Sequence, residues 1–163
     1  MKSHLPEAHL DAWRRYYVSF WRIFGAIDAD LQAAGLPSLS WYDALYELYL
    51  APNRRLRMSE LAHSALLSRS GLTRLVDKLE KAKLIERRSC PTDGRGQEAV
   101  LTEEGVEMLR KIWPVYRAGI AKYFATPLNE KDARDFARMM GKVLDRMEPV
   151  CAKVRAGAEK RAK

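Results

Sequence analysis

The chain has 163 residues, of which 47% are hydrophobic, and it contains four tryptophans. This length and composition suit one domain with its own apolar core and exclude an intrinsically disordered chain. The formal net charge of +8 favours a polyanionic partner such as nucleic acid, although a basic surface that keeps the protein soluble would give the same charge.

The beginning of the sequence lacks the features of an exported protein. Charged residues interrupt the first 20 positions, so no secretory signal with an apolar centre is expected there. No apolar run reaches the roughly 20 residues that a membrane span requires. These features, together with only two cysteines, predict a cytoplasmic protein that has no membrane partner.

A long helix is predicted near the N-terminus, over residues 8–34. Large apolar side chains recur there every three or four positions, and Gly35 and Pro37 then end the pattern. Tyr16 and Ile23 add a second, narrower apolar face. Because a helix that is apolar on two sides must bury both of them, we expect part of it to contact another subunit.

The next segment predicts three short helices. Ser40 is expected to cap a helix over 41–50, and Ser59 and Ser68 are expected to cap the next two, since a serine hydroxyl can satisfy a free N–H group at a helix start. The third helix runs from Arg69 to about Ala82. Its spacing predicts a buried face that is formed by Leu72, Leu75, Val76 and Leu79.

The second and third of these helices are typical of a helix-turn-helix, whose second helix enters the DNA major groove. Arginine can bond guanine through two hydrogen bonds, and serine and threonine can bond bases or phosphates. An ordinary solvated helix face is the alternative interpretation of the same residues. The predicted DNA-contacting side chains are Ser68, Arg69, Ser70, Thr73, Arg74 and Lys78.

A β-hairpin is predicted directly after this helix. Residues 84–88 and 98–101 have the composition of strands, and the segment between them holds one proline and two glycines. A hairpin in this position is a wing, and Arg95 near its tip could insert into a DNA minor groove. Residues 53–98 contain eleven Lys or Arg and six Asp or Glu, so +5 of the net charge lies in this part.

Three arginines, Arg54, Arg55 and Arg57, fill the connection that leads into the helix-turn-helix. They could contact phosphate groups, or they could lie in water within a loop. The sequence leaves both alternatives open.

The C-terminal part predicts two long helices. Thr102 is expected to cap the first of them, and Pro114 should introduce a kink because proline lacks an N–H group and its ring clashes with the preceding turn. Pro127 and Asn129 separate it from the final helix. Both long helices carry apolar stripes that a small central lobe cannot cover.

The predicted fold is therefore mainly α, an α+β winged helix, in a single domain that spans 1–163. A winged helix-turn-helix lobe covers residues 40–102. A helical dimerisation region is expected to combine both chain ends, 8–35 and 103–156, because their apolar stripes need a partner.

The chain resembles the MarR family of winged-helix transcription regulators. The motifs that carry the resemblance occur in the family's order: 73–80 (TRLVDKLE), 84–87 (LIER), Asp93-x-Arg95, and Leu101-Thr102 followed by Gly105. The resemblance implies a two-fold dimer and an effector pocket where the lobe meets the dimerisation region. We expect the DNA operator to be palindromic.

Two positions depart from the family pattern. Glycines flank Arg95, which predicts a more mobile wing. Lys83 stands where the family usually has the glycine that ends the recognition helix, so the sequence leaves the end of that helix undetermined.

The sequence contains an aromatic group that is larger than a small core requires, formed by Trp13, Tyr17, Trp21, Trp41 and Tyr46. Tryptophan and tyrosine combine apolar area with a polar group, which suits a pocket for an aromatic ligand, although packing between the dimerisation region and the lobe is the simpler explanation. The candidate ligand residues are Trp13, Tyr17 and Trp41.

The remaining residues do not predict a catalytic or metal site. The three histidines and two cysteines lack the spacing of metal ligands, and the sequence contains no phosphate-binding loop or nucleophile motif. Arginines beside Cys90 could activate its thiol for redox sensing, but incidental reduced thiols are the simpler interpretation of Cys90 and Cys151. We expect no metal, no cofactor and no enzyme activity.

These observations predict a cytoplasmic, homodimeric, sequence-specific regulator of transcription that binds double-stranded DNA. A repressor that a small aromatic effector releases from DNA is the expected form. A weakly specific or architectural DNA-binding protein is the alternative, and a helical protein-interaction module without DNA function is a third class.

Overall fold

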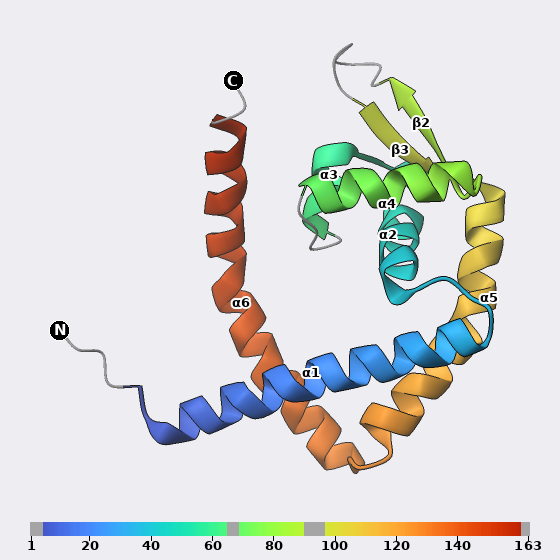
Figure 1. The fold of residues 1–163 in the computed structure, drawn as a ribbon. Helices are drawn as coiled ribbons and strands as arrows, with labels where there is room; N and C mark the ends of the chain where they lie inside the picture. Colours follow the sequence, from blue (N-terminus) through green and yellow to red (C-terminus); the bar gives the residue numbers. More distant parts are fainter. Residues whose placement is uncertain (1–4, 65–68, 90–96, 161–163) are drawn as a thin grey trace. The chain divides into compact units, whose positions relative to one another are not determined.

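A computed structural model of the protein describes residues 5–64, 69–89 and 97–160. The chain forms two compact units, one up to Tyr123 and the other from Phe124. The first unit contains α1 (Glu7–Ala33), α2 (Leu39–Leu50), the 3-10 turn η1 (Pro52–Arg54), β1 (Arg55–Arg57), α3 (Met58–Ser64), α4 (Arg69–Lys81), β2 (Ile85–Ser89), β3 (Gln97–Leu101) and α5 (Glu103–Ile120) (Figure 1). The π-helical turn η2 (Ala121–Ala125) follows, and α6 (Glu130–Lys160) belongs to the second unit. The predicted mainly helical fold with a small sheet is confirmed.

The core of the first unit is formed by the apolar faces of its helices and by the inner side of its sheet. The four residues predicted for the buried face of the third short helix are all buried on α4. Burying a leucine or valine side chain contributes about 1.5–3 kcal/mol, so this face supplies much of the attachment of α4. The largest fully buried side chains are Leu31, Leu45, Leu48, Leu61, Val76, Leu79, Ile85 and Ile112.

The sheet has three antiparallel strands in the order β1-β3-β2. β2 and β3 are the two predicted strands, each displaced by at most one residue at its ends, and together they form the wing. The sequence gives no strand signal for β1, which has only three residues, two of them arginines. β1 forms because Leu56 pairs opposite the buried Ala99 of β3, so its cause is a partner that lies far along the chain.

The predicted caps of α2 and α3 are wrong. α2 begins before Ser40, and the carboxylate of Asp28 on α1 accepts a 2.7 Å hydrogen bond from the backbone N–H of Leu39. α3 begins before Ser59, and Glu60 accepts the hydrogen bond of a backbone N–H group that precedes the helix, at 2.9 Å. At both helix starts a carboxylate, and not the predicted serine, accepts the hydrogen bond of a backbone N–H group. The hydrogen bond of Asp28 also connects α1 to α2.

α4 ends at a left-handed residue, Lys83, whose φ is 60°. The backbone N–H of Lys83 donates to the carbonyl of Glu80 at 2.8 Å, and that of Leu84 donates to the carbonyl of Leu79 at 3.0 Å. These two bonds form a Schellman ending. Gly35 ends α1 in the same way with a φ of 70°, so Lys83 adopts, with a Cβ atom, a conformation that usually favours glycine.

Replacing Lys83 with glycine should raise the free energy of unfolding by about 0.5–1 kcal/mol, because the relief of left-handed strain exceeds the entropy that glycine adds to the unfolded chain. The control Lys81→Gly removes the same side chain from regular helix and should lower that free energy by up to about 1 kcal/mol. Urea unfolding of both variants measures the difference. Destabilisation of the same size by both glycines would contradict strain at Lys83.

α5 begins at its predicted cap. The Thr102 hydroxyl accepts a 3.0 Å hydrogen bond from the backbone N–H of Gly105 and donates at 2.8 Å to the carbonyl of Lys83. This residue therefore joins the start of α5 to the end of α4. The helix continues through Pro114 and changes direction along its length in Figure 1.

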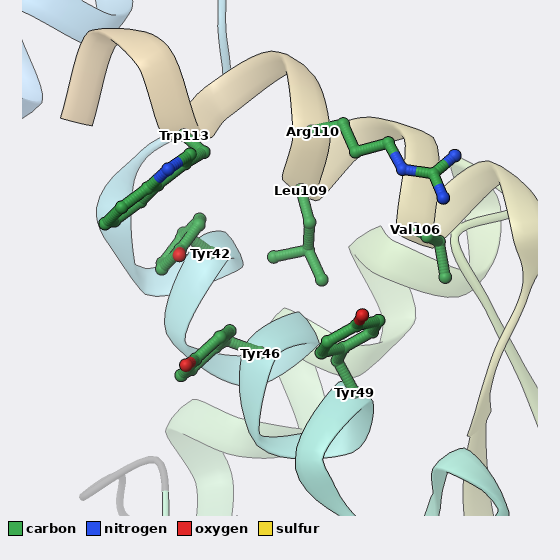
Figure 2. A pocket seen from close by; sticks show the side chains of 7 residues that line it. All are labelled: Tyr42, Tyr46, Tyr49, Val106, Leu109, Arg110 and Trp113. Carbon is green, nitrogen blue, oxygen red and sulfur yellow. The ribbon is translucent and has the colours of Figure 1, made fainter. Parts of the chain in front are cut away.

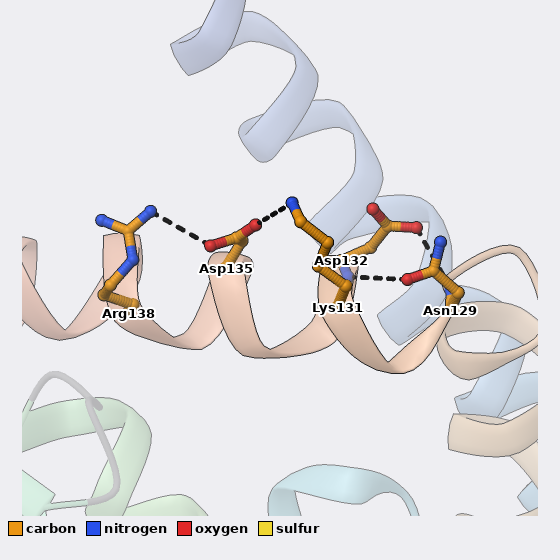
Figure 3. A network of polar contacts seen from close by, with 5 residues as sticks. All are labelled: Asn129, Lys131, Asp132, Asp135 and Arg138. Carbon is orange, nitrogen blue, oxygen red and sulfur yellow. Dashed lines mark hydrogen bonds and ion pairs between the residues drawn. The ribbon is translucent and has the colours of Figure 1, made fainter.

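The second unit is built on α6, which starts with a reciprocal cap. The Asn129 side chain accepts from the backbone N–H of Asp132 at 3.0 Å, and the Asp132 carboxylate accepts from that of Asn129 at 3.2 Å (Figure 3). Asp135 lies between Lys131 and Arg138, and its hydrogen bonds to them lower the pKa of its carboxyl group. No helix in the described part of either unit has the length and apolar character that a membrane crossing requires.

Candidate nucleic-acid interface and aromatic pocket

One face of α4 is exposed along its middle turns. Thr73, Arg74 and Lys78, three of the predicted DNA-contacting residues, lie on this face, and Asp77 lies among them. The amphipathic spacing causes this arrangement, because the apolar residues of α4 turn toward the core. The exposed face therefore presents two cations, a hydroxyl group and one carboxylate.

The other predicted DNA contacts lie at the start of α4 and in the wing. Arg69 and Ser70 are the first two residues of α4. Ser68 and Arg95 lie outside the described residues, as does Cys90.

Arg54 and Arg55, which precede α3, pair with carboxylates. The Arg54 guanidinium lies 2.6 Å from the Glu103 carboxylate at the start of α5, and its central carbon lies 5.8 Å from the ring centre of Tyr49. Arg55 on β1 lies 4.0 Å from Glu98 on β3. Arg54 therefore connects η1 to α5 and to a ring of α2, a role that neither alternative from the sequence includes.

A pocket of about 270 Å³ lies between α2 and α5 (Figure 2). The rings of Tyr42 and Tyr46 are stacked with centres 5.6 Å apart, and Tyr49 continues the row at 6.4 Å from Tyr46. Trp113 stacks on the other side of Tyr42 at 6.4 Å. The complete lining is Tyr42, Tyr46, Tyr49, Val106, Leu109, Arg110 and Trp113.

The three tyrosines form one wall because they are spaced by four and then three residues, which places them on one face of α2. That spacing is visible in the sequence, but the opposite wall comes from α5, more than fifty positions later. Arg110 also lines the pocket, and its guanidinium pairs with the carboxylate of Glu107 on the same helix.

Tyr46, a member of the aromatic group noted in the sequence, lines this pocket, whereas the ligand candidates Trp13, Tyr17 and Trp41 do not. Trp13 and Tyr17 lie on α1 with 61% and 51% of their surface exposed, and their rings contact each other at 6.1 Å. Trp41 on α2 is half-buried and packs against the core of the first unit. The aromatic residues along α1 thus form a group separate from those between α2 and α5.

Burial changes the acidity of groups beside the pocket. It raises the pKa of Asp43 to about 6, and the neighbouring charge of Glu47 adds to this shift. Burial also raises the pKa of Tyr42 to about 12, so its phenol stays neutral and can donate a hydrogen bond at physiological pH. The pKa of Tyr116 is raised by burial and then by Asp43.

Comparison with curated proteins finds regulators of transcription. The transcriptional repressor MprA of Escherichia coli (strain K12) is 34% identical over 120 residues, which cover 72% of this chain and 68% of MprA. The HTH-type transcriptional regulator MhqR of Bacillus subtilis is 31% identical over 86 residues, which cover 53% of this chain and 59% of MhqR.

Solved structures of similar proteins agree with these relatives. Sco3205, a MarR family transcriptional regulator from Streptomyces coelicolor solved in complex with DNA, is 33% identical, with a TM-score of 0.79 over 91% of this chain and 93% of that one. The Mycobacterium tuberculosis MarR family protein RV2887, solved in complex with salicylic acid, is 26% identical, with a TM-score of 0.62 over 88% of this chain and 99% of that one.

A model of the MarR family matches residues 34–96, which include α2 to α4 and β2. The match to MprA extends over more than two thirds of both proteins. The fold, the sequence match and the family model lead to one conclusion: the chain belongs to the MarR family of transcriptional regulators.

Proposed function

We propose that this protein is a homodimeric transcription regulator that binds double-stranded DNA in a sequence-specific manner, and that it is a repressor released by a small aromatic ligand. The observation that carries the proposal is the exposed face of α4, with Thr73, Arg74 and Lys78 on a helix that leads directly into a wing. The name of MprA as a repressor and the DNA complex of Sco3205 support it.

In the proposed complex, α4 enters the major groove. Arg74 bonds a guanine edge, Thr73 bonds a base or a phosphate, and Lys78 contacts a phosphate. Ser68, Arg69 and Ser70 would act at the start of the same helix, where its free N–H groups favour anions. Arg95 would enter the minor groove from the wing.

The proposed dimer uses the apolar surface that α1 and α6 expose. Large side chains along α1 are 38–61% exposed, which is unusual for a helix of a soluble monomer. We therefore assign 8–35 and 103–156 to the dimerisation region. Two-fold symmetry would present two α4 helices to half-sites about 34–36 Å apart on a palindromic operator. The exposed set on α1 is Leu10, Trp13, Tyr16, Tyr17, Val18, Phe20 and Trp21.

The tyrosine pocket between α2 and α5 is the proposed effector site. Its volume of about 270 Å³ suits a single-ring compound, and the stacked faces of Tyr42, Tyr46 and Tyr49 suit an aromatic ring. Arg110 could pair with a carboxylate or phenolate on that ring. The salicylic acid complex of RV2887 supports a ligand of this class. Trp13 and Tyr17 on α1, and Trp41 on α2, are the competing proposed ligand residues.

Binding of DNA is tested by selecting duplexes from a random pool at physiological salt, which should return a palindrome. On that duplex Arg74→Ala should lose about 1–3 kcal/mol per half-site and reduce the ratio of operator to random-DNA affinity. Arg95→Ala should weaken both duplexes with less change in their ratio, because a mainly electrostatic contact does not depend on sequence.

Titrations of both variants on both duplexes, at several salt concentrations, separate the alternatives. Similar binding of all duplexes by the wild type would favour an architectural protein. If the wild type bound no duplex at any salt concentration, the remaining alternative would be a helical protein-interaction module without DNA function.

The effector proposal predicts that salicylate or a related phenol raises the melting temperature and weakens operator binding. A ligand at 100 times its dissociation constant should add about 2.7 kcal/mol to the free energy of unfolding. Tyr46→Ala should abolish both effects, since Tyr46 lies in the middle of the stacked row and its side chain is 40% exposed, outside the core. Loss of both effects in Trp13→Ala or Trp41→Ala, with Tyr46→Ala unchanged, would favour the competing location.

A further inference from the structure

Arg87 on β2 contacts two carboxylates of α4. Its guanidinium pairs with Asp77, and its Nε atom lies 3.4 Å from a carboxylate oxygen of Glu80. The backbone N–H of Arg87 also donates to Glu80 at 3.3 Å. The Arg87 side chain is only 23% exposed, whereas those of Asp77 and Glu80 are 54% and 40% exposed. A mostly buried arginine side chain therefore contacts two carboxylates that are more exposed to solvent than it is.

The position of these acids matters for a helix that approaches DNA. Asp77 lies on the same exposed face of α4 as Arg74 and Lys78. DNA carries one negative charge per about 1.7 Å of helix axis, so an uncompensated carboxylate on that face would be repelled by phosphate groups. Arg87 supplies the compensating charge from the wing strand, on a side chain held within the protein.

We propose that Arg87 is a positioning residue for DNA recognition. Its single positive charge offsets part of the negative charge of Asp77 and Glu80, and its contacts hold both carboxylates against β2, so that they repel DNA phosphate groups less. It acts through the two acids and does not itself contact DNA. This inference rests on the proposed DNA-binding function.

The neighbouring Arg88 provides a matched control. It lies on the same strand, its side chain is 64% exposed, and it pairs with Glu86 of its own strand at 2.8 Å. Arg87→Met and Arg88→Met therefore remove the same charge from adjacent positions. Only the first substitution leaves two acids of α4 without their arginine.

The experiment measures the affinity of both full-length variants for the operator and for a random duplex, after thermal melting has established that each is folded. Arg87→Met should weaken both affinities about tenfold, and Arg88→Met should weaken them less than about threefold, because only the first leaves the acids uncompensated near phosphate groups. Equal losses in the two variants would overturn the inference.

A rescue separates charge compensation from a merely structural connection. Adding Asp77→Asn and Glu80→Gln to Arg87→Met should restore affinity to within about threefold of the wild type, because no carboxylate then needs compensation. Amides cannot replace the missing ion pairs, so a structural role of Arg87 would not be rescued. Failure of the rescue in a folded protein would overturn the inference.

Asp77→Asn alone keeps the test decisive if Arg87→Met does not fold. It leaves Arg87 paired with Glu80 and should maintain or increase DNA affinity, and a fall in affinity would overturn the inference. A wild-type protein that binds no duplex would instead overturn the proposed function on which it rests. DNA binding by the wild type, combined with equal losses in Arg87→Met and Arg88→Met, would leave the proposed function intact.

Discussion

Trp21→Glu should convert the proposed dimer into monomers and lower operator affinity by about 100-fold or more, because a monomer loses the avidity of two linked half-site contacts. Trp21 is 55% exposed on α1 and contacts the rings of Tyr17, Phe20 and Phe24. A carboxylate at this position is well solvated in water, but its burial inside an apolar interface would cost free energy. The substitution should therefore leave each chain folded while it prevents association.

Sedimentation of the variant at micromolar concentration, combined with DNA titration, measures both effects. The control is Leu50→Glu at the end of α2, where a side chain that is 62% exposed lies outside the α1 stripe. This control should remain dimeric and bind the operator normally. A wild type that sediments as a folded monomer would contradict the proposed interface.

Gly105→Ala should lower the free energy of unfolding by about 3 kcal/mol, near the upper end of the usual cost of overpacking. A Cβ atom at this position would overlap the backbone carbonyl oxygen of Leu84 and would lie 2.6 Å from Cδ1 of Leu101. The Leu84 carbonyl cannot easily move away, because it accepts a 3.1 Å hydrogen bond from the backbone of Thr102. The glycine of the Leu-Thr-x-x-Gly motif thus lets α5 start directly against the end of α4.

Gly25→Ala is the matched control for this substitution. A Cβ atom at Gly25 in α1 meets no atom within 4 Å, so alanine should raise stability by about 0.5–1 kcal/mol through better helix propensity. Urea unfolding at constant protein concentration compares the two variants. If Gly105→Ala proved as stable as the wild type, the close approach of α5 to Leu84 would be refuted.

Elements whose signals are local could be predicted from the sequence. The exposed and buried faces of α4 follow from residue spacing, and the Thr102 cap follows from a residue type next to a helical pattern. The wing follows from two short apolar segments on either side of turn residues. In each case the residues that determine the structure lie within a few positions of one another.

Elements that depend on distant partners could not be predicted in this way. β1 exists because Leu56 pairs with a strand more than forty positions later, and α2 is capped by Asp28 from another helix. Lys83 stands where the family usually has glycine, and the sequence does not show how the helix ends there. Tertiary packing holds Lys83 in a left-handed backbone conformation that lysine does not favour.

The candidate site likewise contains one part that the sequence predicts and another part that depends on distant residues. The residues of α4 that face solvent were recognised because one helix supplies all of them. Of the pocket lining, the sequence indicated only Tyr46, because the walls come from α2 and α5 and only the spacing of Tyr42, Tyr46 and Tyr49 is visible locally. The abundance of aromatic residues selected Trp13 and Tyr17, which are exposed on α1 in the proposed dimerisation region.

The shortness of β1 has a consequence for proteins crowded together on DNA. β1 is one edge of the sheet, and its three residues read Arg-Leu-Arg. The opposite edge, β2, carries Glu86, Arg87 and Arg88. An edge strand with unpaired backbone groups can recruit a strand of a neighbouring molecule and start aggregation, and short length and charged side chains oppose this. Neighbouring molecules on one DNA duplex should therefore remain separate, because neither edge offers a long, uncharged strand for sheet extension.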